Sequence, residues 1–253
     1  ERSRESSFKG INKLLEEYYE KIYKEYESDI IDEDCAIKGK IDSKEREKQD
    51  KLMFERKRPD ESNIEYELRA EKRDGMVWEK VITIIFNKIL GENYLIVHSS
   101  KRDDNRGFDT LIVDKKTGEV ICTFDEVETN LQSSRHLEKV AKVDKINKIG
   151  SVIKDGLILK NGKLEQKLLT DIPFFLLQIT KEDFIKILSG MDLNSMDNVS
   201  DIEFEIFDKM IISLETQIEN LKKPGYTKEN LLEKVDKFSD SLEKMKEIRN
   251  KKL

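Results

Sequence analysis

The chain has 253 residues, of which 40% are charged and 37% hydrophobic, and its formal net charge is −6. A chain of this length can sustain its own core without disulfides or a structural metal, and its periodic apolar runs argue against wholesale disorder. The balanced charge gives no overall attraction to a polyanion, so any nucleic-acid surface has to be a local patch. The apolar stretches are far shorter than the roughly 20 residues of a membrane span, and the two widely spaced cysteines suit a reducing cytoplasm.

Two stretches in the N-terminal part of the chain carry apolar residues at helical spacing. They predict a helix over residues 7–27 and a second one over 61–90, in which Gly75 can act as a break and Gly91 as the C-terminal stop. The segment 38–58 between them carries nine Lys/Arg and five Asp/Glu. It is typical of a solvated helix or an exposed loop, and a basic face toward DNA is the alternative interpretation.

The middle of the chain carries the signals of a sheet. Strands are expected at 94–98, 108–114 and 119–128, with a hairpin loop at 115–118 whose Gly118 supplies a positive φ. A helix over 133–149, ended by Gly150, follows. Short strands near 157–160 and 172–179 complete the sheet. The last of these is so continuously apolar that we expect it to be central and covered on both faces.

Beyond residue 180 the pattern is helical throughout. Two heptad-like stripes, at 211–221 and 231–245, are separated by a Pro-Gly turn at 223–227, where Thr227 is the expected N-cap. These features predict a C-terminal helical hairpin that packs on the core or on a partner.

Acidic residues gather at the open end of the hairpin formed by 108–128. Symmetric pairing about its loop places Asp109 opposite Phe124, which makes Asp109 and Glu126 diagonal neighbours. Glu126 and Glu128 share one face of the second strand because side chains alternate, whereas Val127 points toward the core. Three carboxylates are therefore expected to converge.

Such a cluster repels itself unless a cation is present, and carboxylate oxygens on rigid strands are ligands that Mg²⁺ prefers. We expect Asp109 and Glu126 to be metal ligands, with the carbonyl oxygen of Val127 as a further one. A metal held in this way lowers the pKa of a bound water and stabilises charge on a phosphate. Glu128 would orient or deprotonate that water, or help to hold a second metal. The alternative is that the acids form a solvated strand end.

An Asp, a hairpin and a Glu-x-Lys at the end of the second strand form the signature of the PD-(D/E)XK nucleases. The run Phe108-Asp109 followed by Glu126-Val127-Glu128 resembles this signature. Glu128 stands where the signature usually has Lys, and this departure resembles the BamHI-like type II restriction endonucleases. The run Phe-Asp-Glu-Val-Glu-Thr-Asn-Leu-Gln-Ser-Ser-Arg-His at 124–136 is similar to that family as well. The resemblance covers about residues 107–150.

The resemblance implies an α/β fold of the restriction-endonuclease type, in which helices flank a mixed central β-sheet, here with a C-terminal helical hairpin. We expect the chain to form one compact unit with a charged helical region at 1–75, a catalytic core at 76–180 and a helical extension at 181–253. The resemblance also implies a further acid from an N-terminal helix near the metal. Glu79 is the candidate for this catalytic role, and Glu92 is the weaker one.

The resemblance further implies that the entrance of the helix after the second strand faces DNA. Amide, hydroxyl and basic side chains that can contact bases or phosphates occur there, namely Asn130, Ser133, Ser134, Arg135 and His136. Basic residues just before the first hairpin strand are expected to grip the DNA backbone, namely Lys101, Arg102 and Arg106. Ordinary helix capping by the serines and an exposed position for His136 are the alternatives.

Taken together, these features predict a type II restriction endonuclease that cleaves double-stranded DNA at specific sequences and depends on Mg²⁺. A homodimer is implied, because cutting both strands of a palindrome with one site per chain requires a two-fold axis. A DNA repair or defence nuclease of the same fold is one alternative. A non-catalytic helical interaction protein, which the two C-terminal apolar stripes favour, is the other.

Overall fold

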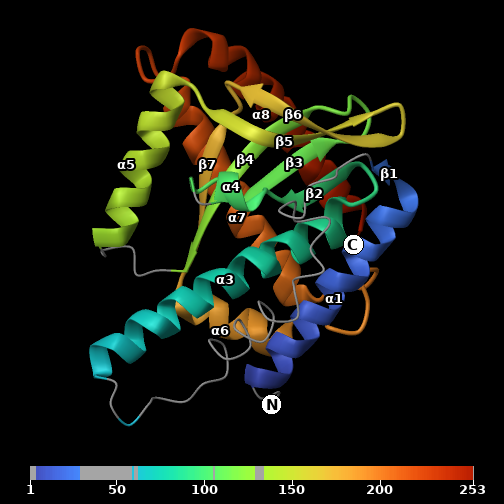
Figure 1. The fold of residues 1–253 in the computed structure, drawn as a ribbon, viewed down its shortest axis with the longest axis vertical. Coiled ribbons are helices and arrows are strands. Elements are labelled where there is room, and N and C mark those ends of the chain that lie inside the picture. Colours follow the sequence, from blue (N-terminus) through green and yellow to red (C-terminus); the bar gives the residue numbers. More distant parts are fainter. Residues whose placement is uncertain (1–3, 29–58, 60–61, 105, 129–133, 253) are drawn as a thin grey trace.

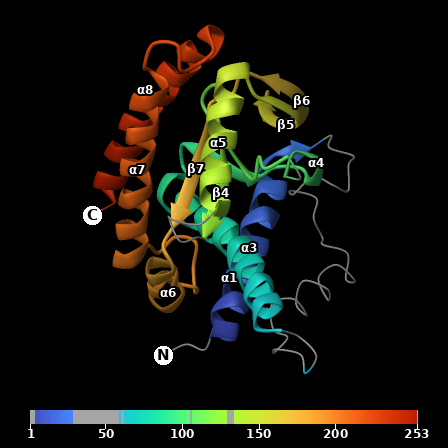
Figure 2. The ribbon, with the colours of Figure 1, turned by 90° about the vertical axis from the view of Figure 1, so that its left-hand side faces the viewer.

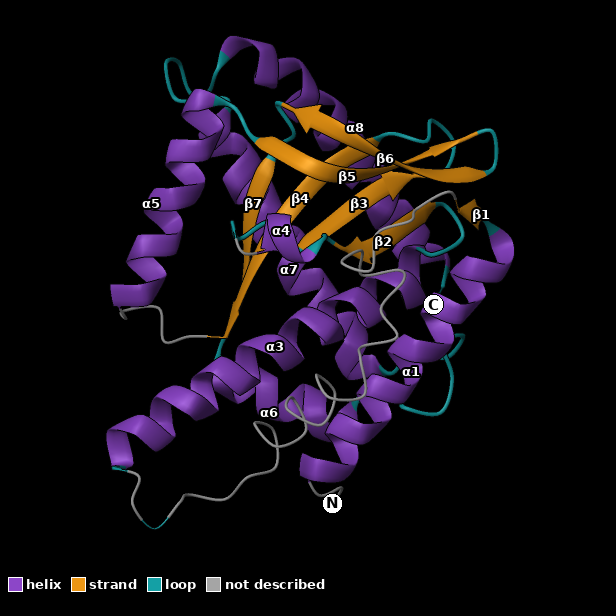
Figure 3. Cartoon of the chain, in the orientation of Figure 1, coloured by secondary structure: helices purple, strands orange, loops and turns teal. Residues whose placement is uncertain are grey.

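A mixed α/β architecture emerges from the computed structural model, which describes residues 4–28, 59, 62–104, 106–128 and 134–252. Helices flank a four-stranded mixed sheet, a three-stranded sheet lies beside it, and a helical pair ends the chain (Figures 1 and 3). The predicted fold class is confirmed at this level. None of the helices in these ranges combines the length and apolarity needed to cross a bilayer. The charged segment 38–58 lies outside the described residues.

The two N-terminal helices pack against each other. Helix α1 spans Arg4–Glu25 and is followed by the short strand β1, Glu27–Ser28, and helix α3 spans Asn63–Leu90. The expected break at Gly75 is wrong, because α3 runs through it without interruption. A glycine costs a helix interior only about 1 kcal/mol relative to alanine. Burial of the apolar residues that follow, such as Trp78, Val81 and Ile85, outweighs that cost.

The central sheet has the strand order β2-β3-β4-β7. Strands β2 (Tyr94–His98), β3 (Thr110–Asp114) and β4 (Val120–Glu128) are antiparallel neighbours, and β7 (Phe174–Ile179) pairs in parallel with β4. The expected symmetric register of the β3–β4 hairpin is wrong by one residue at its open end, where Thr110 rather than Asp109 lies opposite Phe124. The register shifts between Ile112 and Val113, because Ile121 is an extra residue in β4.

Aromatic contacts identify the helices that cover each face of this sheet. On one face, the centroid of the Phe86 ring of α3 lies 5.9 Å from that of Phe124 and 5.2 Å from that of Phe207 in α7 (Asp201–Leu221). Phe175 contacts Phe238 of α8 (Glu229–Lys251) at 4.8 Å on the same side. Helix α5 (Ser134–Ile149) covers β7 on the opposite face. Figure 2 shows α7 and α8 running side by side, with α5 on the other side of β7.

Strand β7 is the outer strand of the sheet, so the expectation that it is central is wrong. Its outward main-chain groups are bonded by side-chain amides instead of a further strand. Asn147 of α5 donates to Phe174 O at 2.7 Å and accepts from Phe174 N at 3.1 Å. Gln217 of α7 makes the same pair of bonds with Leu176, both at 2.9 Å. The apolar composition of β7 reflects its covered faces and says nothing about its edge.

The opposite edge of the sheet is bonded in the same way. Asn87 of α3 donates to Ile96 O at 3.1 Å and accepts from Ile96 N at 3.4 Å. The hydroxyl of Tyr18 also donates to Ile96 O at 3.0 Å, and that of Tyr19 accepts from His98 N at 3.3 Å. Edge strands otherwise present unpaired groups to other chains. In this protein, side chains satisfy part of both edges.

The smaller sheet has the order β1-β6-β5, with β5 at Val152–Lys160 and β6 at Lys163–Thr170. Strand β5 begins before the expected 157–160, and β6 was not predicted because charged and polar residues interrupt its apolar ones. A one-turn helix, α4 (Lys101–Asp104), is tied to β5 by the buried Asp103, whose carboxylate accepts from Lys154 N at 3.0 Å and from Asp155 N at 2.8 Å.

Helix α6 (Lys181–Gly190) leads into the predicted hairpin of α7 and α8. Thr227 is not the N-cap of α8. That position belongs to Lys228, and the Thr227 hydroxyl donates to Leu221 O at 2.7 Å at the end of α7. A fully buried ion pair joins the start of α7 to the core, since Lys88 Nζ of α3 lies 2.7 Å from Glu203 Oε1.

Candidate active site

Asp109 and Glu126 meet where β3 begins beside β4. Asp109 is fixed by its main chain, whose N–H donates to Phe124 O at 2.8 Å and whose carbonyl accepts from Ser99 N at 2.8 Å. Its Oδ2 accepts a hydrogen bond from Glu126 N at 2.9 Å, across 17 residues of sequence. The shifted register therefore still brings the two acids together.

The Glu126 carboxyl group is buried in an unusual way. The residue is 2% exposed, and neither of its carboxylate oxygens has a hydrogen-bond partner among the described residues. Burial and then the charge of Glu79 raise the pKa of Glu126 well above its usual range. Burial and the charge of Glu126 raise the pKa of Asp109 likewise. Unpaired buried carboxylate oxygens are costly, so the carboxyl group stays protonated unless a cation or a water adjoins it.

Two further acids reach this place from other elements. Glu79 of α3 is partly buried, and burial together with the charge of Asp104 raises its pKa to about 8. Asp104 ends α4, and burial raises its pKa as well. The structure thus gathers the predicted Glu79, Asp109 and Glu126. It adds Asp104, which no local sequence pattern pairs with these acids, because α4 reaches the site only through the fold.

Next to Glu126 in β4, a buried acid is held by two lysines of α5 and acts by its charge on all four acids of the site. Asp125 is 1% exposed, and its carboxylate binds Lys139 through Oδ1 and Lys142 through Oδ2, the latter at 3.2 Å. Lys139 also donates to the carbonyl oxygen of Glu126 at 2.9 Å. Its positive charge partly offsets the rise in the pKa of Glu79 and of Asp104. No motif in the sequence marks either lysine or Asp125 as part of the site.

The acids of this site meet part of what a divalent cation needs. Among the described residues, no three or more His, Cys, Asp or Glu side chains form a group that could hold a metal ion. Mg²⁺, however, usually needs only one or two carboxylates together with waters and substrate phosphates. Asp109 and the unpaired oxygens of Glu126 fit that requirement. Val127 lies opposite Gln178 in the β4–β7 ladder, and its carbonyl as a ligand stays a prediction.

Several predicted residues lie in or beside parts that the structure does not describe. The main chain of Glu128 pairs with Ile179, but its side chain is outside the description. The same holds for the side chains of Lys101, Ser134 and Arg135, and for Asn130 and Ser133 entirely. Their predicted roles remain predictions.

The remaining predicted residues are described. Arg102 is exposed and lies 3.9 Å from Asp155, and Arg106 donates to Val152 O at 2.7 Å, so both basic side chains contact the β5 segment. Both side chains are exposed, and their contact with the DNA backbone stays a prediction. Glu92 follows α3 just before β2 begins, at the end of that strand away from Asp109.

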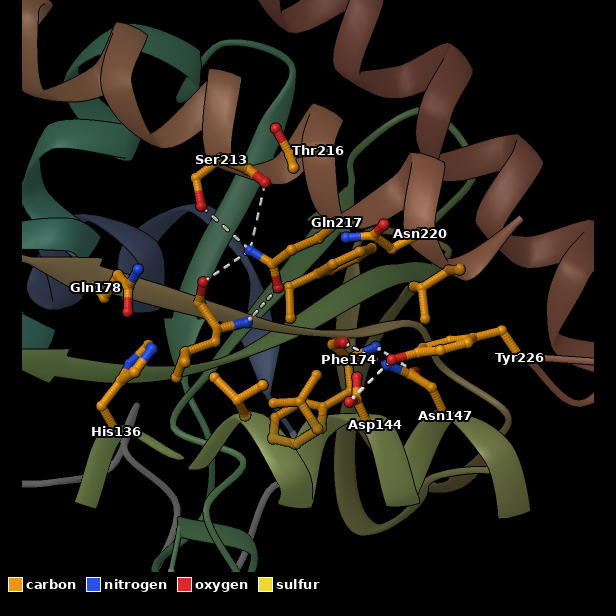
Figure 4. A pocket seen from close by; sticks show the side chains of 15 residues that line it. His136, Asp144, Asn147, Phe174, Gln178, Ser213, Thr216, Gln217, Asn220 and Tyr226 are labelled. Carbon is orange, nitrogen blue, oxygen red and sulfur yellow. Dashed lines mark hydrogen bonds between the residues drawn. The ribbon is translucent and has the colours of Figure 1, made fainter. Parts of the chain in front are cut away.

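His136 lines a cavity of about 370 Å³ between α5, β7 and α7 (Figure 4). The floor of this cavity is the outer edge of β7, where Asn147 and Gln217 make their amide bonds, and Asp144 accepts from the Tyr226 hydroxyl at 3.0 Å at its far end. Figure 4 shows the His136 ring beside Gln178. His136 therefore faces β7 at the first turn of α5.

Comparison with protein-family models, curated proteins and solved structures finds no match to this chain.

Proposed function

We propose that this chain is a Mg²⁺-dependent, sequence-specific endonuclease of the type II restriction class that cleaves phosphodiester bonds of double-stranded DNA as a homodimer. The single observation that carries the proposal is the convergence of Asp109, the unpaired carboxylate of Glu126 and the partly buried Glu79. The order of elements supports it. A helix, three antiparallel strands, a second helix and a parallel strand follow one another, as a restriction-endonuclease-like core requires, with α4 and the β5–β6 hairpin as insertions.

Each acid has a role in this proposal. Asp109 and Glu126 would hold Mg²⁺, which, when bound, polarises the phosphate and acidifies a water. Asp109 is fixed through its main chain, and Glu126 through its N–H bond to Asp109, so the two carboxylates are positioned in advance. Glu79 adds negative charge to the site when it ionises, and Glu128 is the proposed water-orienting or basic group.

The first experiment tests cleavage itself. Purified protein is incubated with plasmid DNA and Mg²⁺ or EDTA, and the ends of any discrete fragments are mapped. Asp109→Asn and Glu126→Gln should each lower the rate by at least about 100-fold, because the metal contributes several kcal/mol of transition-state stabilisation. Glu92→Gln is the matched control, since Glu92 is exposed and lies away from the site. Near-wild-type cutting by either site variant would remove the assignment.

Sequence recognition is tested separately, with Ca²⁺ replacing Mg²⁺ to suppress cleavage. Arg135→Ala should weaken binding to the mapped site by roughly 1–3 kcal/mol and relax the preference at one base pair, whereas Arg102→Ala should weaken binding to all sequences. If Arg135→Ala reduces the affinity for the mapped site and for a one-base variant equally, Arg135 belongs with the backbone contacts.

A further inference from the structure

Lys142 lies at the edge of the acidic site and has unused hydrogen-bonding capacity. Its ammonium group carries three donors, and the described residues offer it one acceptor, Asp125 Oδ2 at 3.2 Å. Its side chain is 35% exposed, compared with 20% for Lys139. Lys139, in contrast, is bonded both to Asp125 and to the Glu126 carbonyl. The two lysines therefore differ in their freedom to contact a ligand.

The Lys142 ammonium lies directly against Gly107, in the turn that leads into Asp109. Gly107 has a φ of +76°, and a Cβ built on it would lie 1.7 Å from Lys142 Nζ. Its N–H donates to Asp104 O at 2.6 Å, so the backbone is fixed between Asp104 and Asp109. Any other residue at 107 would force the ammonium away from this position, which adjoins the turn that leads into Asp109.

Charge complementarity indicates what the ammonium binds. Lys139 and Lys142 share one contacting carboxylate, Asp125, and the charges of both lysines also act on Asp104 at the mouth of the site. A phosphodiester that approaches the acids is repelled by their charge unless positive groups adjoin it. Lys142 is the more exposed of the two lysines and lies next to the turn that leads into Asp109, so its ammonium is the positive group that a phosphate can reach there.

We propose that the Lys142 ammonium binds a DNA phosphate at the site formed by Asp109 and Glu126, and that Lys139 is a positioning residue that holds Asp125 and thereby Lys142. This inference rests on the proposed function and adds an anion-binding position to it. The ligand is a phosphodiester of the DNA backbone, so the contact carries no base preference.

The test measures binding of a DNA duplex in Ca²⁺ at several salt concentrations. Lys142→Met keeps the apolar stem and removes the charge, and it should weaken binding about tenfold and lower the salt slope by about one unit. Lys142→Arg should retain most of the affinity and the full slope. Lys145→Met is the matched control from an exposed position of the same helix and should change neither value as strongly.

A double substitution tests the role of Lys139. If Lys139 acts through Lys142, adding Lys139→Met to Lys142→Met should lower the salt slope no further, whereas two independent phosphate contacts would lower it by about two units in total. Urea unfolding of each variant is measured alongside. If the ion pairs with Asp125 are purely structural, the substitutions change the free energy of unfolding and leave the salt slope of DNA binding unaltered. An unchanged affinity and slope for Lys142→Met would overturn the inference while wild-type cleavage still supported the proposed function. A wild-type protein that neither binds nor cuts DNA would overturn both.

Discussion

The raised pKa of Glu79 predicts that the cation-free protein loses stability as the pH rises. In the unfolded chain this carboxyl group titrates near its ordinary value of 4.5, whereas in the folded protein its pKa is about 8. Between these values the folded state keeps a proton that the unfolded state has released, so stability falls as the pH rises through this window. At about 1.4 kcal/mol per pKa unit, the loss by pH 8 is on the order of 4 kcal/mol.

The substitution Glu79→Gln removes this ionisation and keeps the size of the side chain. Urea unfolding of wild type and variant would be compared at pH 5 and pH 8 in excess EDTA. Trp78 is the only tryptophan of the chain, is fully buried and precedes Glu79, so its fluorescence reports unfolding around the site. We expect the wild-type free energy of unfolding to fall by about 3 kcal/mol more than that of the variant over this range, while the raised pKa values of Asp109 and Glu126 leave some pH dependence in both proteins.

Glu92→Gln, at an exposed position, should leave the pH dependence unaltered. Mg²⁺ added at pH 8 should restore much of the wild-type stability, because a ligand that binds only the folded state stabilises it. Equal pH slopes for wild type and Glu79→Gln would refute the reasoning. A Glu79→Gln variant that is less stable than wild type at pH 8 would refute it as well.

Three further substitutions test other parts of the molecule. Lys88→Met leaves the Glu203 carboxylate buried without its cation, and urea unfolding should show a loss of about 3–5 kcal/mol; a change below 1 kcal/mol would contradict the importance of this pair. Asn147→Leu removes both side-chain bonds from the main chain of Phe174, and we expect a loss of about 1–3 kcal/mol with increased light scattering on heating, whereas an unchanged unfolding midpoint would argue against edge protection. Glu128→Lys creates the common nuclease signature, yet it should abolish plasmid cleavage because the proposed site uses a third negative charge; an active variant would show that the position only orients a water.

Local patterns in the sequence predicted most of the elements and one essential contact. Strand 94–98 was predicted with its observed bounds, and the helix over 61–90 nearly so. The pairing of Asp109 with Glu126 was also predicted, although the register was not. A bulge residue such as Ile121 has no sequence signal of its own, so the register was not predictable. Asp109 and Glu126 still meet, because the Asp109 side chain accepts a hydrogen bond from the Glu126 N–H.

The features that escaped prediction depend on tertiary placement. Lysines recur along α5 at 139, 142, 145 and 148, and on sequence alone they are equivalent. Only the packing of α5 against β7 determines that Lys139 and Lys142 reach Asp125. Burial of β7 was evident from its apolar residues, but its position at the edge was not, because the amides that bond it come from helices elsewhere in the chain.

The amides at the two edges of the central sheet also restrict how copies of this protein can associate. Asn87 bonds the main chain of β2, and Asn147 and Gln217 bond that of β7, so neither edge offers a continuous row of free groups to a strand of another molecule. Growth by strand addition is open-ended and leads toward fibres, whereas contacts between helical surfaces can close around a two-fold axis. An exposed helical side chain such as Ile212 of α7, 62% exposed, is available for contacts of the second kind. The bonded edges of the central sheet thus hinder strand addition, even though its outer strand is among the most apolar segments of the chain.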